Sequence, residues 1–207
     1  MRVSFLIDGF NLYHSLKDLG GTGVRWLDLI GFCKSYLPHI DRAATLNRVL
    51  YFSALATHLQ SRDPDAVNRH RTYISCLEDS GVDVVLGQFK SKTVSCRNCG
   101  HQWQSHEEKE TDVAIAAHLI EQLADDACAA AVLVTGDTDL AAGVKVAKRM
   151  FPHKEVIFIF PFRRKSQELA KLVSRTFRVK GDRYRRHQFP DPYTLRDGSL
   201  IPRPRSW

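Results

Sequence analysis

Four aspartates and one asparagine are the residues best suited to do chemistry. Asp8 and Asn11 lie in FLIDGFNLY, Asp112 in EKETDVAIA, and Asp137 and Asp139 in LVTGDTDLAAGV. Two carboxylates ~4 Å apart at an effective dielectric of about 20 repel by roughly 4 kcal/mol. Magnesium or manganese relieves that repulsion and keeps coordination sites for water and a phosphate. If these acids converge, they predict metal-dependent hydrolysis of a phosphodiester.

The elements that would position these residues alternate along the chain. Short apolar runs occur at 3–8, 47–54, 82–89, 130–135 and 155–160, and segments of helical period lie at 26–37, 64–79, 112–124, 139–150 and 166–174. Runs such as AVLVT and VIFIF are apolar on both faces, which predicts a parallel sheet covered on both sides. We therefore expect an α/β fold, a three-layer α/β/α sandwich with a mainly parallel sheet, over residues 1–160. Ligands bind beyond the carboxyl ends of the strands in such sheets, and the acids lie there.

Each of these polar residues also has a purely structural interpretation. Aspartate is a favoured helix N-cap and is stabilised near a helix N-terminus, so Thr138 or Asp139 could cap the helix that follows. Asn11 could equally cap a helix or form an Asx-turn. Capping accounts for any single acid. It accounts less well for four carboxylates that three separate elements deliver to one edge.

The three segments FLIDGFNLY, EKETDVAIA and LVTGDTDLAAGV resemble, in this order, the signature segments of the NYN domain, a PIN-like ribonuclease family. The resemblance covers about the first 165 residues. It implies a PIN-like fold and a magnesium or manganese site made by Asp8, Asp112, Asp137 and Asp139. It also implies that Asn11 orients a water, a metal ligand or the scissile phosphate, and that an activated water hydrolyses RNA.

One position departs from the family pattern. The family often has a second acid six residues after the aspartate of its middle segment, and this chain has His118 there. Six residues at ~100° each turn that side chain away from the face of Asp112, which favours a helix-surface histidine over a peripheral metal ligand or a phosphate contact. Glu107 and Glu108 fit a solvated polar loop, and Glu110 stays open as an additional carboxylate near the site.

A polar insertion at residues 90–108, KSKTVSCRNCGHQWQSHEE, interrupts the alternation and is longer than an ordinary connection. Its C-x-x-C-G turn is typical of zinc knuckles. The candidate zinc ligands are Cys96, Cys99, His101 and His106. His101 follows Cys99 closely, so a ligand could instead come from elsewhere in the chain or from a second subunit. A flexible loop without metal and a redox pair are the alternatives.

Basic and aromatic residues point to a nucleic acid as partner. Residues 161–207, a basic C-terminal extension, carry a net charge of +9, whereas residues 1–160 carry −2. Cations neutralise phosphates and aromatic rings stack on unpaired bases. Trp103, which lies among basic residues of the insertion, could stack on a base or equally pack on the domain. The candidate RNA-binding residues are Trp103, Arg163, Arg164, Lys165, Arg183, Arg185 and Arg186.

Composition narrows the class of protein. The 207 residues are 43% hydrophobic and 26% charged, which is ordinary for a globular domain. No apolar run approaches the ~18 residues of a membrane span, and the first residues lack a signal-peptide pattern. Five cysteines, three of them isolated in predicted helices, do not form a disulfide framework. We therefore expect a cytoplasmic protein that is not bound to a membrane.

The sequence predicts a metal-dependent ribonuclease that uses magnesium or manganese, with zinc as a second, structural metal. An RNA-binding or regulatory protein of the same fold with little catalysis is the main alternative. A phosphatase-like hydrolase with the same acids is a third class, which the basic end disfavours. A homo-oligomer and a regulatory protein partner both stay open.

Overall fold

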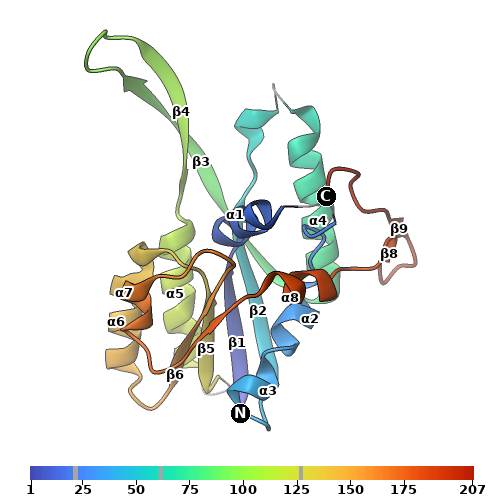
Figure 1. The fold of residues 1–207 in the computed structure, drawn as a ribbon, viewed down its shortest axis with the longest axis vertical. Coiled ribbons are helices and arrows are strands. Elements are labelled where there is room, and N and C mark those ends of the chain that lie inside the picture. The colour runs from blue at the N-terminus through green and yellow to red at the C-terminus, as the bar shows by residue number, and fades with distance from the viewer. Residues whose placement is uncertain (21–22, 61–62, 126–127) are drawn as a thin grey trace.

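The computed structural model describes residues 1–20, 23–60, 63–125 and 128–207, and a seven-stranded sheet forms its centre (Figure 1). The strand order is β4-β3-β2-β1-β5-β6-β7. All pairs are parallel except β3 with β4. The bounds are β1 Arg2–Asp8, β2 Thr45–Ala54, β3 Asp83–Ser95, β4 Gln102–Lys109, β5 Ala130–Val134, β6 Glu155–Phe160 and β7 Thr176–Arg178. The predicted α/β fold with a mainly parallel sheet is confirmed.

Helices cover both faces of the sheet, and each face has its own apolar core (Figure 1). One face carries α1 Gly9–Leu19, α2 Leu29–Lys34, α3 Leu37–Ile40, α4 Pro64–Ser80 and α8 Gly181–Arg186. The other carries α5 Thr111–Ala124, α6 Ala141–Met150 and α7 Gln167–Ala170. Two short turns of 3-10 helix, η1 Thr57–Leu59 and η2 Thr138–Leu140, follow β2 and β5. The three layers of the predicted sandwich are therefore present.

The central strands are buried because helices pack on both of their faces. All five residues of β5, AAVLV, are buried, and β1 is buried from Val3 to Asp8. β1 and β5 run in parallel with Ile7 beside Val134, so their last residues reach the same edge together. The chain leaves this edge into α1 on one side and into η2 on the other. The parallel register thus brings the end of FLIDGFNLY next to the start of TGDTD.

The segment at 90–108 is a correction to the sequence analysis, because it forms an antiparallel hairpin instead of an irregular loop. β3 continues past the sheet and pairs with β4, from Gln88 beside Lys109 to Ser95 beside Gln102. This hairpin, called the arm below, projects away from the body of the protein (Figure 1). Most of its side chains are exposed, so its strands lack the apolar alternation by which a half-buried strand is recognised.

The basic C-terminal segment packs on the domain. Residues Thr176–Arg178 form the seventh strand, and Tyr184 of α8 is fully buried in the core. The phenol of Tyr184 lies 3.0 Å from the hydroxyl of Ser15, and the indole of Trp26 donates to the carbonyl of Pro190 at 3.1 Å. A two-stranded ribbon, β8 Tyr193–Thr194 with β9 Leu200–Ile201, follows.

The helix expected at 26–37 is two short helices, α2 and α3, preceded by the buried Trp26 and Leu27.

Within the described residues, no helix has both the length and the apolar character that a membrane crossing requires.

Candidate metal centre

Three carboxylates meet at the carboxyl edge of the sheet. Asp8, Asp112 and Asp137 each offer an oxygen, and these oxygens all lie within 4.8 Å of one another. Asp8 ends β1, Asp137 follows β5, and Asp112 is in the first turn of α5. They line a pocket of about 320 Å³. The convergence that the sequence predicted for these three acids is therefore present.

Asp8 combines two roles that the sequence left as alternatives. It caps α1, because its Oδ1 accepts the backbone N–H of Asn11 at 2.9 Å. Its other oxygen accepts the hydroxyl of Thr135 at 2.8 Å. Only 4% of Asp8 is exposed. Capping and convergence are thus compatible, and the cap fixes the orientation of the carboxylate.

The loop after β5 is held by hydrogen bonds to its neighbours. Thr135 accepts the backbone N–H of Asp137 at 3.0 Å while its own hydroxyl donates to Asp8. The side-chain oxygen of Asn11 accepts the N–H of Gly136 at 3.1 Å. Thr135 therefore links Asp8 to Asp137. Asn11 connects α1 to the loop that carries Asp137. Thr135 is not among the predicted site residues, although it directly precedes the GDTD motif.

Glu108 is a fourth acid in the wall of the pocket, and the sequence analysis favoured a solvated role for it. It ends the arm beside α5, where its Oε1 accepts the backbone N–H of Thr111 at 3.1 Å and also the hydroxyl of that residue. Glu108 thus holds the start of the helix that carries Asp112. Glu110, two residues further on, has a positive φ of 84° and forms an ion pair with Lys90.

Burial and the neighbouring carboxylates raise the pKa values of Asp8 and Asp112. Burial raises the pKa of Asp8, and the charge of Asp137 adds to the rise, while the hydrogen bonds from Asn11 and Thr135 oppose it. Burial, followed by the charges of Asp137 and Asp8, raises the pKa of Asp112 to about 6. The cluster therefore holds more negative charge than its protein surroundings compensate, and hard oxygen ligands of this kind fit a divalent cation.

A close backbone contact shapes one side of the pocket. A Cβ on Gly136 would lie 1.9 Å from the carbonyl oxygen of Arg164, so glycine lets the loop after β6 pack against the loop after β5. Arg164 itself lines the pocket and pairs with Asp18 of α1. Its neighbour Arg163 adopts a positive φ of 61°. The packing of these two loops brings a cation to the acidic pocket.

The family model described as the NYN domain matches residues 2–179. The chain belongs to the NYN domain family. This membership suggests a PIN-like nuclease.

One curated relative of this NYN domain is the protein named 6-hydroxy-3-succinoylpyridine 3-monooxygenase HspA, from Pseudomonas putida (strain DSM 28022 / S16). The two are 28% identical over 178 residues, which cover 72% of this chain and 56% of the relative. The chain thus matches little more than half the length of that relative.

A solved structure with the same fold is VPA0982 from Vibrio parahaemolyticus RIMD 2210633, a protein described as of unknown function. The TM-score is 0.57 and the sequences are 18% identical. The match covers 87% of this chain and 94% of the other. This likeness concerns the fold alone.

Asp139 and His118 lie outside the group of three carboxylates. Asp139 is exposed, and its backbone N–H donates to Asp137 at 3.1 Å. Its charge nevertheless contributes to the raised pKa of Asp112. His118 lies along α5, where Nδ1 is 2.6 Å from Glu121 and the ring centre is 5.4 Å from that of Phe52. The helix-surface interpretation of His118 agrees with these contacts.

The four candidate zinc ligands are spread along the arm. Cys96 and Cys99 share the turn at its tip, where Gly100 donates to the carbonyl of Cys96 at 2.9 Å. Backbone N–H groups of Cys99 and Asn98 lower the pKa of the Cys96 thiol. His106 instead stacks on His58 of η1, with ring centres 4.4 Å apart. Over the residues the structure describes, the histidines and cysteines do not form one group of metal ligands.

The candidate RNA-binding residues divide into two sets. Arg163 and Lys165 are exposed in the loop beside the acidic pocket, and Arg185 and Arg186 are exposed on α8. Arg183 is engaged within the fold, since it donates to Ser35 and its guanidinium lies 4.2 Å from the ring centre of a buried tyrosine.

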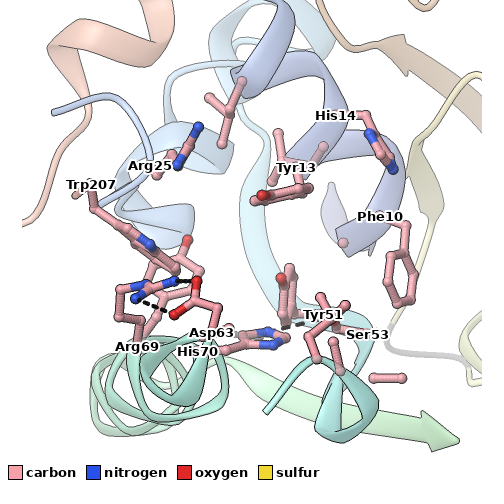
Figure 2. Close-up of a pocket in the computed structure, with 18 of the residues that line it drawn as sticks. Phe10, Tyr13, His14, Arg25, Tyr51, Ser53, Asp63, Arg69, His70 and Trp207 are labelled. Atoms are coloured by element: carbon pink, nitrogen blue, oxygen red, sulfur yellow. Dashed lines mark hydrogen bonds and ion pairs between the residues drawn. The ribbon is translucent and has the colours of Figure 1, made fainter. Parts of the chain in front are cut away.

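A second cavity, of about 430 Å³, adjoins the acidic pocket across the first turns of α1. Phe10 and His14 line both. Figure 2 shows Tyr13 and His14 of α1 on one side, and Ser53 and His70 on the opposite side. Residues distant in the sequence build the walls of this cavity, so no local pattern predicts it.

Proposed function

We propose that this NYN domain is a metal-dependent ribonuclease, which hydrolyses RNA phosphodiester bonds with a metal-activated water. The observation that carries the proposal is the group Asp8, Asp112 and Asp137, whose oxygens lie within 4.8 Å of one another. Magnesium or manganese held there would polarise the phosphodiester and lower the pKa of a bound water. Family membership supports RNA as the substrate class.

The other residues of the pocket would position this chemistry. Thr135 and the cap on α1 hold Asp8, and Glu108 holds the helix start that carries Asp112. Asn11 keeps the Gly136 loop in place, which is the positioning role proposed for it. Arg164 is proposed to neutralise the scissile phosphate, because it lines the pocket and carries a permanent positive charge.

Exposed cations and one aromatic side chain would bind the rest of the RNA. Arg163 and Lys165 flank the acidic pocket, and Trp103, 46% exposed, lies on the arm beside the ring of His101. Such residues bind unpaired strands by neutralising phosphates and stacking on bases. Asp139 is proposed as an additional ligand, whose carboxylate would contact the metal ion once it is bound.

Zinc is proposed as a second metal, at the tip of the arm. Cys96 and Cys99 are close enough to interact, and backbone N–H groups stabilise the thiolate of Cys96. Because a structural zinc ion takes four ligands, the remaining two would come from outside this turn. Zinc analysis of the purified protein tests this. One ion per chain would place the remaining ligands in the same chain, and one ion per two chains would place them in a second copy.

Cleavage of end-labelled RNAs, structured and unstructured, tests the nuclease proposal. We expect cleavage with manganese or magnesium that a chelator stops and that Asp8→Asn and Asp137→Asn abolish. Asp65→Asn, an exposed aspartate in the first turn of α4, is the matched control and should cleave normally. RNA binding without cleavage would favour the alternative of a regulatory RNA-binding protein.

The name of the curated relative gives a second candidate, oxygenation of a small heteroaromatic compound. The observation that favours it is the aromatic-lined cavity beside the acids. Oxygen consumption by the purified protein with 6-hydroxy-3-succinoylpyridine and a reduced nicotinamide cofactor tests this. Turnover would replace the nuclease proposal if RNA cleavage is absent.

A further inference from the structure

The cavity next to the acidic pocket has the size and position of a binding site. Its volume of about 430 Å³ falls in the ~300–1,000 Å³ range of sites for small molecules. It lies between α1, η1 and α4. Phe10 and His14 separate it from the acidic pocket and belong to both walls. A group bound in this cavity would therefore be next to a group bound at the acids.

Flat aromatic rings make up much of the wall. The rings of Phe10 and Phe89 meet edge to face, with their centres 5.7 Å apart. The centre of the Phe89 ring lies 4.5 Å from that of His58. Tyr13 and Trp207 line the cavity farther from the acids, and 42% of Tyr13 is exposed. Aromatic faces attract planar heterocycles by stacking. Every nucleobase has such a planar face, so the stacking does not require one particular base.

Polar groups that are neutral lie at one side of the same cavity. Burial lowers the pKa of His70 to about 4, so its ring is uncharged at pH 7 and carries one donor and one acceptor. The hydroxyl of Ser53 is 3.5 Å from Nε2 of His70. Nδ1 of His58 has no hydrogen-bond partner among the described residues. Neutral donors and acceptors beside aromatic faces suit the edge of a nucleobase.

The charged groups of the cavity lie at the end that Trp207 lines (Figure 2). Arg69 is neutralised by its ion pair with Asp63. Arg25 lies at the same end, with its guanidinium 5.6 Å from the centre of the Tyr13 ring. This distribution leaves the aromatic interior uncharged and provides a cation where a phosphate could lie.

We propose that this cavity binds the base of an unpaired nucleotide whose neighbouring phosphate lies at the acidic cluster. The proposal rests on the proposed function for the place of the strand, but not on hydrolysis. It predicts that the protein binds single-stranded RNA more tightly when a base is present at that position. The strand and a free nucleotide are the two sources of such a base.

Equilibrium binding of a short fluorescent oligoadenylate in manganese tests the proposal, with Asp8→Asn in every protein, the one with a wild-type cavity included, to prevent cleavage. Ala66→Leu fills the cavity from α4, and Tyr13→Ala removes an exposed wall. Each should weaken binding about tenfold, within the range for losing one stacked base. Asn68→Leu places the same side chain on an exposed position of α4 and should bind normally. The oligomer with an abasic site should bind wild type and variants equally.

Two outcomes would overturn the proposal. Either both cavity variants bind the oligoadenylate like the wild type, or adenosine monophosphate alone shows the loss, which would make this a site for a free nucleotide. Cleavage of bis(p-nitrophenyl) phosphate by the wild type with manganese tests the acidic site separately. Its absence would refute the proposed hydrolysis and leave the cavity proposal standing on the binding data.

Discussion

Asp137→Asn should stabilise the metal-free protein and destabilise the metal-bound protein relative to wild type. Without an ion, the charge of Asp137 raises the pKa values of both Asp8 and Asp112, which means that it repels them when they are ionised. An asparagine removes that repulsion and can still accept the hydrogen bond that Asp139 donates to residue 137. With an ion bound, the same substitution removes a ligand.

The size of the metal-free effect follows from Asp112. Its pKa rises from 3.8 to about 6, and each unit corresponds to about 1.4 kcal/mol, so the total shift bounds the cost at about 3 kcal/mol. Burial is the largest cause, and Asp112 is half-buried and screened by solvent. The share of Asp137 is therefore about 1 kcal/mol. For a chain of this size that is a rise in Tm of about 2–4 °C.

A bound metal ion reverses the order of stability of the wild type and Asp137→Asn. An ion at a hundredfold its Kd stabilises the wild type by about 2.7 kcal/mol, or roughly 5–11 °C in Tm. Asp137→Asn should lose most of this gain and melt below the wild type. The metal-free advantage should also shrink from pH 7 to pH 5. With raised pKa values, Asp8 and Asp112 take up protons in the folded state first as the pH falls, and the repulsion then disappears.

Calorimetry of both proteins in a chelator and in manganese measures these shifts. Asp65→Asn is the matched control, because its exposed carboxylate lies on α4, outside the acidic pocket, and it should keep the full gain. A lower Tm for Asp137→Asn in the chelator, or an undiminished gain in manganese, would show that these carboxylates do not share one ion.

Three further outcomes are expected. Burial depresses the pKa of His70 from 6.5 to about 4, so the unfolded state binds more protons than the folded state between these pH values. Up to about 3 kcal/mol of the free energy of unfolding is therefore lost as the pH falls from 6.5 to about 4. Urea titrations of His70→Gln should lack this loss. Gly136→Ala should lower the free energy of unfolding by about 1–3 kcal/mol, because the added Cβ meets the backbone of the neighbouring loop; denaturation that matches wild type would contradict this packing. Replacing Cys96 and Cys99 by serine should abolish zinc binding without changing the manganese-induced rise in Tm, and zinc retained by that variant in elemental analysis would exclude the arm as its site.

The parallel sheet and three of the acids could be predicted because each depends on local sequence. Strands buried on both faces must be apolar throughout, as β5 is, and their carboxyl ends meet at one edge. Once the strands were assigned, Asp8 and Asp137 had to lie at the same edge of the sheet, and the pairing of β1 with β5 then brings them together. Asp112 followed from its place at the start of a helix.

The rest of the site depends on contacts that local sequence does not encode. Glu108 resembles any solvated glutamate until the arm is known to return beside α5, and His106 meets His58 from a distant part of the chain. The basic extension at residues 161–207 likewise has no local pattern that shows whether it packs on the domain. Its buried Tyr184 and Phe189 settle it on the domain.

The outer edge of the arm bears on how the protein avoids its own aggregation. β4 ends the strand order, so over the described residues its outer N–H and C=O groups have no strand beside them. An open edge of this kind is a template for pairing with another chain, and charged side chains oppose such pairing. Of its eight residues, QWQSHEEK, only Trp103 is strongly apolar. The polarity that concealed this strand in the sequence therefore also keeps the arm from recruiting further strands, and valines at Gln102 and Gln104 would be expected to promote fibrous association.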